Sequence, residues 1–401
     1  MRSLKMAIYI GIGIGQDKDT LQATREALRL AKSNLHAEKI DLAIVFSSID
    51  FSHQNILKLT GDTLGETPVV GCSSFALISK QGIFKYGILV ALLSLPEGIY
   101  LSTAFIKEIS SKSVTLAGEE LGEKLLYGFK NIRRDLSVIF SDGLMHDAAG
   151  FLWGLQEKLG KSFPLAGASA SDNLAFKKTY QYCANEVFSG GACGILWGGK
   201  LNFGMGLKHG WKPLGKPRYV TKASGNVVNE IDGLPAATIY EEYLAADLVK
   251  LKGELRRISI FYPIGIFLPG EEEYLLRISL SIEDNGALVF QGNVPQGSMI
   301  RLMIGTKESC LEATRQAADE AKNGLLGKPS NFVLVFNSVS RYILLGRQVN
   351  KELEEIQGIF GKETPIIGIY TYGEQAPLKA INFQGRAHLH NQSIEILAIG
   401  G

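Results

Sequence analysis

The amino-acid sequence predicts an α/β fold: a two-lobed mixed-sheet sandwich built from a diverged internal repeat, with helices packed on the sheets. The repeat is visible first in a helical segment, because LQATREALRLAKSN at 21–34 returns as LEATRQAADEAKNG at 311–324. The same offset of 290 aligns the strand-like runs DLAIVFSS at 41–48 and NFVLVFNS at 331–338. A third version, DLSVIFSD, stands between them at 135–142. One α/β unit therefore recurs three times.

Each copy contains a helix, a buried strand, a small polar residue, a second helix and a strand that opens with proline. That last strand appears as PVVG at 68–71, PLAG at 164–167 and PIIG at 365–368. The strand runs are almost continuously apolar, which is typical of strands covered on both faces of a sheet. Polar residues at the ends of these strands predict a polar rim where a ligand could bind.

Hydrophobic periodicity and turn residues predict the elements in chain order. Strands are expected at 6–15, 41–47, 68–72, 227–233, 257–268, 274–283 and 287–292, and helices after Asp17 or Thr20, at 53–64, at 113–129 and after Pro235. Two antiparallel hairpins are also expected. Pro96-Glu97-Gly98 would join runs 82–95 and 99–107, and Ser189-Gly190-Gly191 would join runs 179–188 and 192–197.

A segment rich in glycine, proline and lysine at 211–217 separates two predicted domains. The first, 1–219, would hold two repeat copies, and the second, 220–401, would hold one, at 308–399. A length of 401 residues agrees with two or three domains at roughly 150 residues each.

Composition narrows the classes of function. A net charge of +2 with scattered basic residues gives no reason to expect nucleic acid as a partner. No segment approaches the roughly 20 apolar residues that cross a bilayer, so we expect no membrane insertion. Four dispersed cysteines without a CxxC motif predict a reduced, cytoplasmic protein without a structural zinc site.

Two motifs suggest cofactors or metals and lack the residues to support them. Gly11-Ile12-Gly13-Ile14-Gly15 follows the pattern of a dinucleotide loop, but it lacks the third glycine, and Asp41 begins the next strand rather than ending it. Flexibility at a strand end is the simpler explanation of these glycines. His388 and His390 share a strand face without a third ligand at metal-like spacing. We therefore predict neither a cofactor nor a metal.

Candidate ligand-binding residues lie just past the strands. They are Cys72 and Ser73, then Ser141 and Asp142, and then Ser169, Asp172 and Asn173 in a run of small residues. Small residues let backbone donors approach a ligand, and a helix N-terminus attracts anions. Capping and Asx turns explain the same residues without a ligand. His209 beside Trp211, and Tyr372 and Glu374 from the second lobe, complete the set.

The sequence resembles the FIST family, named for F-box and intracellular signal transduction proteins, with its N-terminal and C-terminal domains in tandem. The resembling stretches spread over nearly the whole chain: 71–74, 164–173, 188–192, 209–211, 220–226, 230–236, 295–298, 372–374 and 390–393. The resemblance implies a sensory module that binds a small ligand, such as an amino acid or a related metabolite. Gly368-Ile369 departs from the Gly-Cys that the family often shows.

The sequence contains no recognisable kinase, cyclase, methyl-accepting or F-box segment, so we expect the output to come from a separate signalling protein or an oligomer. Two other functions stay open. An acyl-transfer or hydrolytic enzyme could use the Cys72 thiol with His146 or His209 as base. A scaffold would instead present a large exposed apolar surface without a pocket.

Overall fold

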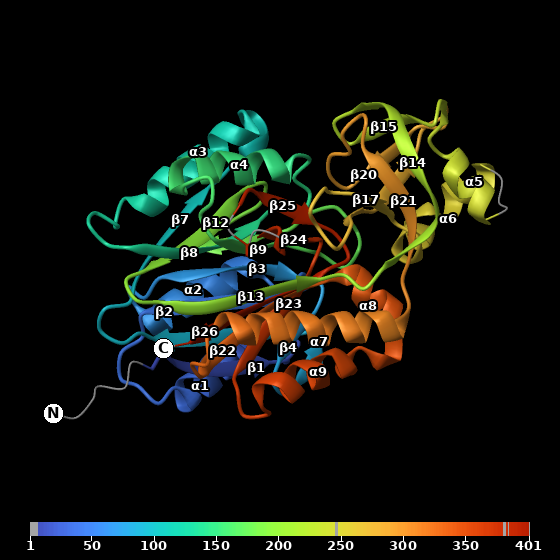
Figure 1. Cartoon of the computed structure of the whole chain (residues 1–401). Coiled ribbons are helices and arrows are strands. Elements are labelled where there is room, and N and C mark those ends of the chain that lie inside the picture. Colours follow the sequence, from blue (N-terminus) through green and yellow to red (C-terminus); the bar gives the residue numbers. More distant parts are fainter. Residues whose placement is uncertain (1–6, 245–247, 380–381, 384, 401) are drawn as a thin grey trace.

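The computed structural model describes residues 7–244, 248–379, 382–383 and 385–400. Three copies of one unit form a large lobe, which we call the body, and residues 212–304 form a separate small lobe (Figure 1). The predicted α/β fold with mixed sheets and packed helices is confirmed. Among the described residues, no helix combines the length and apolar character needed to cross a bilayer.

The first two copies are uninterrupted and have the same order of elements. The first consists of β1 (Tyr9–Gly15), α1 (Thr20–Asn34), β2 (Leu42–Ser48), α2 (His53–Leu64), β3 (Val69–Ser74), β4 (Leu77–Ser79), β5 (Gly82–Phe84) and β6 (Ile88–Ser94). The second consists of β7 (Tyr100–Ile106), α3 (Val114–Leu126), β8 (Arg134–Ser141), α4 (Ala148–Leu159), β9 (Leu165–Ser169), β10 (Gln181–Cys183), β11 (Glu186–Phe188) and β12 (Ala192–Gly198).

The third copy is split by the small lobe. It begins with β13 (Asn202–Lys208) and resumes with α7 (Lys307–Gly324), β22 (Ser330–Ser338), α8 (Val339–Leu345), α9 (Asn350–Phe360), β23 (Ile366–Thr371), β24 (Gly373–Pro377), β25 (Ala387–His390) and β26 (Ile394–Gly400). The small lobe is inserted after β13, the first strand of the third copy. It therefore adds to the separation in sequence between α1 and α7, which align at an offset of 290.

The small lobe consists of a twisted sheet and two helices. Its elements are β14 (Lys212–Ser224), β15 (Val227–Ile231), β16 (Leu234–Pro235), α5 (Thr238–Leu244), α6 (Leu248–Phe261), β17 (Ile264–Ile266), β18 (Leu275–Arg277), β19 (Ser279–Ile282), β20 (Leu288–Phe290) and β21 (Met299–Ile304). The predicted domain boundary between residues 219 and 220 falls within β14 and stays a prediction.

The three copies exchange their hairpins in a cycle. The strand orders are β1-β6-β2-β3-β10-β11, β7-β12-β8-β9-β24-β25 and β13-β26-β22-β23-β4-β5. The β4–β5 hairpin of the first copy thus extends the sheet of the third, β10–β11 extends the first, and β24–β25 extends the second. Each sheet contains a segment of another copy, so no copy can complete its sheet alone.

Both predicted hairpins were wrong. β6 pairs with β1 and β2 instead of with β7, and β12 pairs with β7 and β8 instead of with β11. The physical reason is burial: β6 and β12 are fully buried strands, and each pairs with a strand on both of its sides. The turns at 96–98 and 189–191 therefore join different layers of the body.

One phenylalanine from each copy meets its equivalents at the centre of the body. Phe46, Phe140 and Phe336 occupy the same position in the three aligned strand runs. The ring of Phe140 lies 5.5 Å from that of Phe46 and 5.9 Å from that of Phe336, both edge to face. This geometry is favourable for aromatic pairs and places the approximate three-fold centre of the body in its core.

Candidate functional site

The polar strand ends of the three copies meet in one buried seam, where they bond mainly to one another. The Ser73 hydroxyl donates to the carbonyl of Ser171 at 3.0 Å, which joins the first copy to the second. The Gln375 amide of the third copy donates to the hydroxyls of Ser169 at 3.0 Å and Ser141 at 2.5 Å. The seam therefore holds the copies together, and its hydroxyls have protein partners.

Two predicted aspartates shape loops beside this seam. The Asp172 carboxylate accepts the backbone N–H of Ala175 at 2.9 Å and of Lys177 at 2.9 Å, together with the hydroxyl of Tyr372. Burial raises the pKa of Asp172, but these hydrogen bonds outweigh it and hold the pKa below its usual value. Asp142 accepts the N–H groups of Leu144 and Gly190 at 2.7 Å each, a loop-bracing role.

The other predicted residues differ in exposure. Cys72 is fully buried in the core, and burial raises the pKa of its thiol. Asn173 is exposed and its amide donates to Asp50 at 3.2 Å. Glu374 is buried in the seam, whereas His209 and Tyr372 line cavities. The structure thus distributes the predicted residues among the core, the buried seam, two cavity walls and, for Asn173, the exposed surface.

Glu374 makes the seam sensitive to pH. Its carboxylate accepts hydrogen bonds from the hydroxyls of Thr371 and Ser393, both at 2.6 Å, yet burial raises the pKa of Glu374 from 4.5 to about 7. Between those values the unfolded chain releases this proton before the folded chain does. The contribution of Glu374 to stability therefore falls as pH rises from about 4.5 to 7.

We expect Glu374→Gln to remove this pH dependence. The stability of the variant relative to wild type should increase by up to about 3 kcal/mol between pH 5 and pH 8, because one pKa unit corresponds to about 1.4 kcal/mol. Urea unfolding of both proteins at the two pH values measures the difference, and the buried histidines cancel because both proteins contain them. A difference that does not change with pH would show that folding leaves the pKa of Glu374 unshifted.

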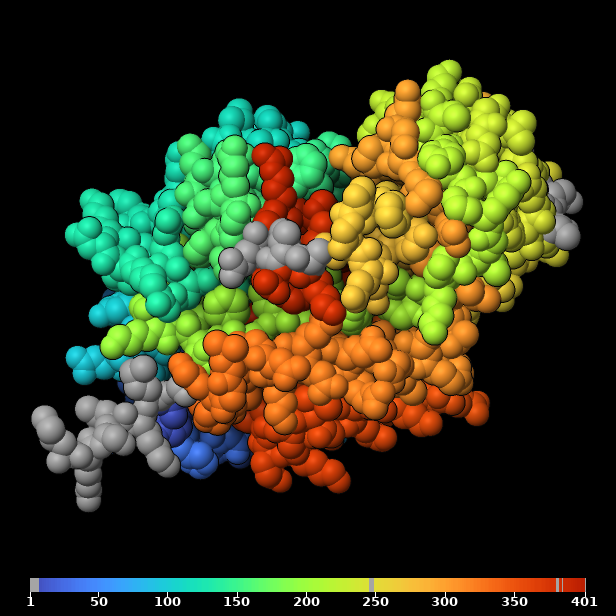
Figure 2. Space-filling view, in the orientation of Figure 1, coloured from blue at the N-terminus to red at the C-terminus, as the bar shows by residue number. Residues whose placement is uncertain are grey.

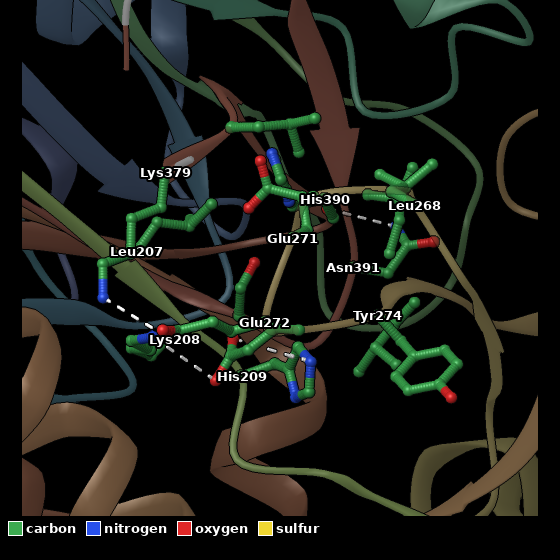
Figure 3. A pocket seen from close by; sticks show the side chains of 16 residues that line it. Leu207, Lys208, His209, Leu268, Glu271, Glu272, Tyr274, Lys379, His390 and Asn391 are labelled. Atoms are coloured by element: carbon green, nitrogen blue, oxygen red, sulfur yellow. Dashed lines mark hydrogen bonds and ion pairs between the residues drawn. The ribbon is translucent and has the colours of Figure 1, made fainter. Parts of the chain in front are cut away.

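A polar cavity of about 240 Å³ lies where the body meets the small lobe. Four chain segments line it: the end of β13 through His209, residues 268–276 of the small lobe, Leu378 and Lys379 after β24, and the β25–β26 connection with His390 and Asn391. Figure 3 shows these side chains converging from the different segments. In Figure 2 the yellow part of the small lobe meets the red C-terminal strands above orange α7 on this face.

Two buried polar atoms of this wall lack a hydrogen-bond partner among the described residues: Nε2 of His209 and Oδ1 of Asn391. The backbone N–H of Trp211 donates to Nδ1 of His209 at 2.9 Å, so the neutral ring carries its proton on Nε2. Burial lowers the pKa of His209, which keeps the ring neutral at pH 7. The cavity wall therefore contains one acceptor without a partner among the described residues, Oδ1 of Asn391, and one donor, Nε2 of His209, that lies near the backbone of Tyr274 and the carboxylate of Glu273 without forming a hydrogen bond of normal geometry.

Charges of both signs surround the same space. Lys208 lies 3.7 Å from Glu273 and 3.5 Å from Glu320, while Lys379 lies 2.6 Å from Glu320. Nε2 of His209 lies 3.6 Å from a Glu273 oxygen, beyond hydrogen-bonding distance. Leucines complete the lining: Leu207, Leu268, Leu275, Leu276 and Leu378. A ligand with a positive group, a negative group and some apolar surface fits these walls.

Most residues that line the polar cavity were not predicted from the sequence. His209 was predicted, but Lys379, Glu273 and Asn391 were not. Asn391 lies in the stretch 390–393 that carries part of the family resemblance, which was the one available signal. The residues of the 268–276 segment have no motif, and only the docking of the small lobe brings them to the body.

The fold and the cavity define a repeat α/β protein with a cavity of about 240 Å³ between its body and an inserted lobe. The model of the FIST N domain matches residues 41–234, and that of the FIST C domain matches residues 236–377. The chain belongs to the FIST family, as its motifs indicated, and FIST domains are sensory domains of signal transduction.

Relatives match this chain at low sequence identity. An uncharacterized protein of Methanocaldococcus jannaschii is 28% identical over 350 residues, which are 79% of this chain and 65% of the archaeal protein. An uncharacterized protein of Mycobacterium tuberculosis is 21% identical over 381 residues, 93% of this chain and 96% of the relative. This chain thus spans slightly less than two thirds of the archaeal relative.

Among solved structures, a cyanuric acid hydrolase described as an innovation by structural concatenation aligns with 98% of this chain and 99% of its own. The TM-score is 0.38 and the sequence identity 8%. A similarity of that size supports no inference about activity.

Proposed function

We propose that this protein is a cytoplasmic, non-catalytic sensor that binds a small zwitterionic metabolite, such as an amino acid, in the polar cavity. It passes the signal to a separate protein. Support comes from the sensory family and from the mixed charges of the cavity wall. The other residues predicted to bind ligand, such as Ser141 and Asp172, then hold the seam and its neighbouring loops in place and do not contact the ligand.

The unpaired Nε2 of His209 and Oδ1 of Asn391 carry the proposal. A buried polar atom without a partner costs free energy, so its presence in a cavity wall favours a ligand that satisfies it. The carboxylate of an amino acid would accept from Nε2 of His209 and lie near Lys208 or Lys379. Its ammonium group would donate to Oδ1 of Asn391 and to Glu272 or Glu273.

The polar cavity lies between the two lobes, so a bound ligand can change how the lobes dock and in this way produce a signal. Hydrogen bonds join the lobes beside it: Arg277 donates to the Leu389 carbonyl at 3.0 Å, and Gln392 donates to the carbonyls of Ile260 at 2.8 Å and Ser259 at 3.1 Å. A ligand that contacts both lobes binds best when they are docked. Its binding would therefore shift the population toward the docked arrangement that a partner protein recognises.

A thermal-shift screen with the twenty amino acids, followed by titration calorimetry, tests this proposal. A ligand at about 100 times its Kd stabilises the folded protein by about 2.7 kcal/mol, which raises Tm. Asn391→Leu should weaken the ligand about ten-fold or more, because a hydrogen bond to a charged group contributes about 1.5–3 kcal/mol. The ligand-free variant should keep its stability, since the substitution removes an unpaired buried oxygen.

Asn331→Leu is the matched control. The amide oxygen of Asn331 is also buried and unpaired among the described residues, but this residue lies on β22 away from the cavity lining. Its replacement should leave affinity unchanged. Equal affinity of Asn391→Leu and wild type, or no stabilisation by any amino acid, would contradict the proposed site.

The surroundings of Cys72 count against the thiol-dependent enzyme. A nucleophilic cysteine needs a thiolate and solvent access. Cys72 is fully buried, and burial raises its pKa, so the thiol stays protonated at neutral pH. His209 lines the polar cavity, whereas Cys72 does not. We therefore favour the sensor.

A further inference from the structure

A second cavity, of about 310 Å³, lies between the body and the small lobe, where β22 and β23 end. Ser338, Thr371 and Tyr372 contribute the edge of the body, and α6 and β19 of the small lobe contribute the opposite wall. Seven of its fourteen lining residues are aliphatic or phenylalanine: Leu174, Phe176, Ile260, Ile278, Leu280, Val339 and Ile343. This lining differs from that of the polar cavity.

The body wall of this apolar cavity is held in a costly backbone conformation. Leu174 and Phe176 have φ angles of 64° and 51°, in the left-handed region that branched and bulky residues avoid. The Asp172 carboxylate compensates by accepting the N–H groups of this loop, including that of Phe176 at 3.1 Å. Strain of this kind concentrates at binding sites.

Aromatic contacts fix the same wall. The rings of Phe176 and Tyr372 stack with their centres 4.6 Å apart and an angle of 12° between their planes. The Tyr372 hydroxyl bonds to Asp172, and its carbonyl accepts from Gln291 of the small lobe at 2.6 Å. The cavity is therefore shaped before any ligand arrives, which lowers the entropy cost of binding.

The charge at this cavity has one sign. Arg256 and Arg257 of α6 line it, and no aspartate or glutamate of the described residues does so. Arg257 pairs with Glu254 at 2.8 Å. The Arg256 guanidinium instead lies over the Phe176 ring, 5.1 Å from its centre, and no carboxylate among the described residues pairs with it. An apolar space beside such an arginine suits an apolar anion.

We propose that this cavity binds a small organic carboxylate with an aliphatic or aromatic body, its carboxylate on Arg256 and its body against Phe176 and Ile343. The site is separate from the polar cavity and goes beyond the proposed function, because none of the described residues that line it offers an acidic group for an ammonium ion. Both ligands would contact both lobes, so each would favour the same docked arrangement. Binding of one should then strengthen binding of the other.

Fluorescence of anilinonaphthalene sulfonate, an apolar aromatic anion, tests the site in the full chain. The dye should bind with one equivalent, and octanoate should displace it at concentrations about five-fold or more below those of octanol, its neutral counterpart. Arg256→Gln should weaken both anions about five-fold. Arg315→Gln is the matched control, because Arg315 is exposed on α7 and pairs with Glu312. It should change nothing.

Ile343→Trp fills the space and should abolish dye binding while circular dichroism and Tm show a folded protein. If that variant does not fold, Leu280→Trp fills the cavity from the small lobe instead. Asn391→Leu should still bind the dye, which separates this proposal from that for the polar cavity. Dye binding that survives a folded cavity-filling variant, octanol as effective as octanoate, or no binding to wild type would each overturn the proposal.

Discussion

Replacing Arg341 by methionine should lower the free energy of unfolding by about 3–5 kcal/mol, because it leaves a buried carboxylate without its partner. Arg341 is fully buried on α8 and pairs with Glu352 of α9 at 2.7 Å. It also donates to the carbonyls of His209 at 2.6 Å and Cys310 at 2.8 Å. One guanidinium thus connects three helices, α7, α8 and α9, to the wall of the polar cavity.

Urea unfolding measures this loss, and two variants identify its cause. Arg341→Met combined with Glu352→Gln should be more stable than Arg341→Met alone, since the unpaired buried charge is gone. Arg315→Met, which breaks the exposed pair with Glu312, should cost less than about 1 kcal/mol. A double variant as unstable as Arg341→Met would show that lost packing, rather than an unpaired charge, is responsible.

Gly13→Ala should destabilise the protein by about 3 kcal/mol or more, although it adds one methyl group. A Cβ at Gly13 would lie 2.0 Å from the carbonyl oxygen of Ala27 and 2.6 Å from the nitrogen of Ala31, both in α1. Backbone atoms cannot yield as a flexible side chain can, so α1 would have to move off the sheet. Thermal and urea unfolding would measure the loss.

Gly358→Ala is the control for this substitution. Gly358 lies in α9, and a Cβ there would meet no atom within 4 Å. Alanine in a helix should stabilise it by roughly 0.5–1 kcal/mol relative to glycine. If Gly13→Ala were equally harmless, the close approach of α1 to β1 would not limit stability.

The glycines at 11, 13 and 15 show how a local pattern can be explained wrongly. The sequence suggested flexibility at a strand end. In the structure all three lie within β1, where an added Cβ would come within 2.1 Å of α1 backbone atoms. Gly204 and Gly206 of β13 approach α7 in the same way. These glycines allow the first helix of a copy to pack closely on its first strand.

Most elements of the body were predictable because their signals are local. The helix at 53–64 and the strand at 41–47 agree with α2 and β2 to within one residue at each end. The third copy was recognised from α7 onward, while its first strand was missed because the inserted lobe separates β13 from the rest. Local periodicity identifies elements but cannot show which distant element joins them.

The candidate site was less predictable than the fold. The polar strand ends drew attention to Ser73, Ser141 and Ser169, and these do lie together, but they bond to protein groups in the seam. Of the residues that line cavities, only His209 and Tyr372 had been predicted. A polar residue at a strand end can form hydrogen bonds to a neighbouring copy or to a ligand equally well. The sequence does not show which of the two partners it has.

The amino-acid sequence is sufficient to show that one α/β unit occurs three times, where its buried strands run and where their polar ends fall. Short-range periodicity and direct repetition carry all of that information. The folded structure was needed to show that the hairpins are exchanged among the copies, that Phe46, Phe140 and Phe336 meet, and that His209 and Asn391 line one cavity. Those outcomes depend on pairing and burial between residues far apart in the chain, where the gain from a complete, buried sheet exceeds that from a local turn.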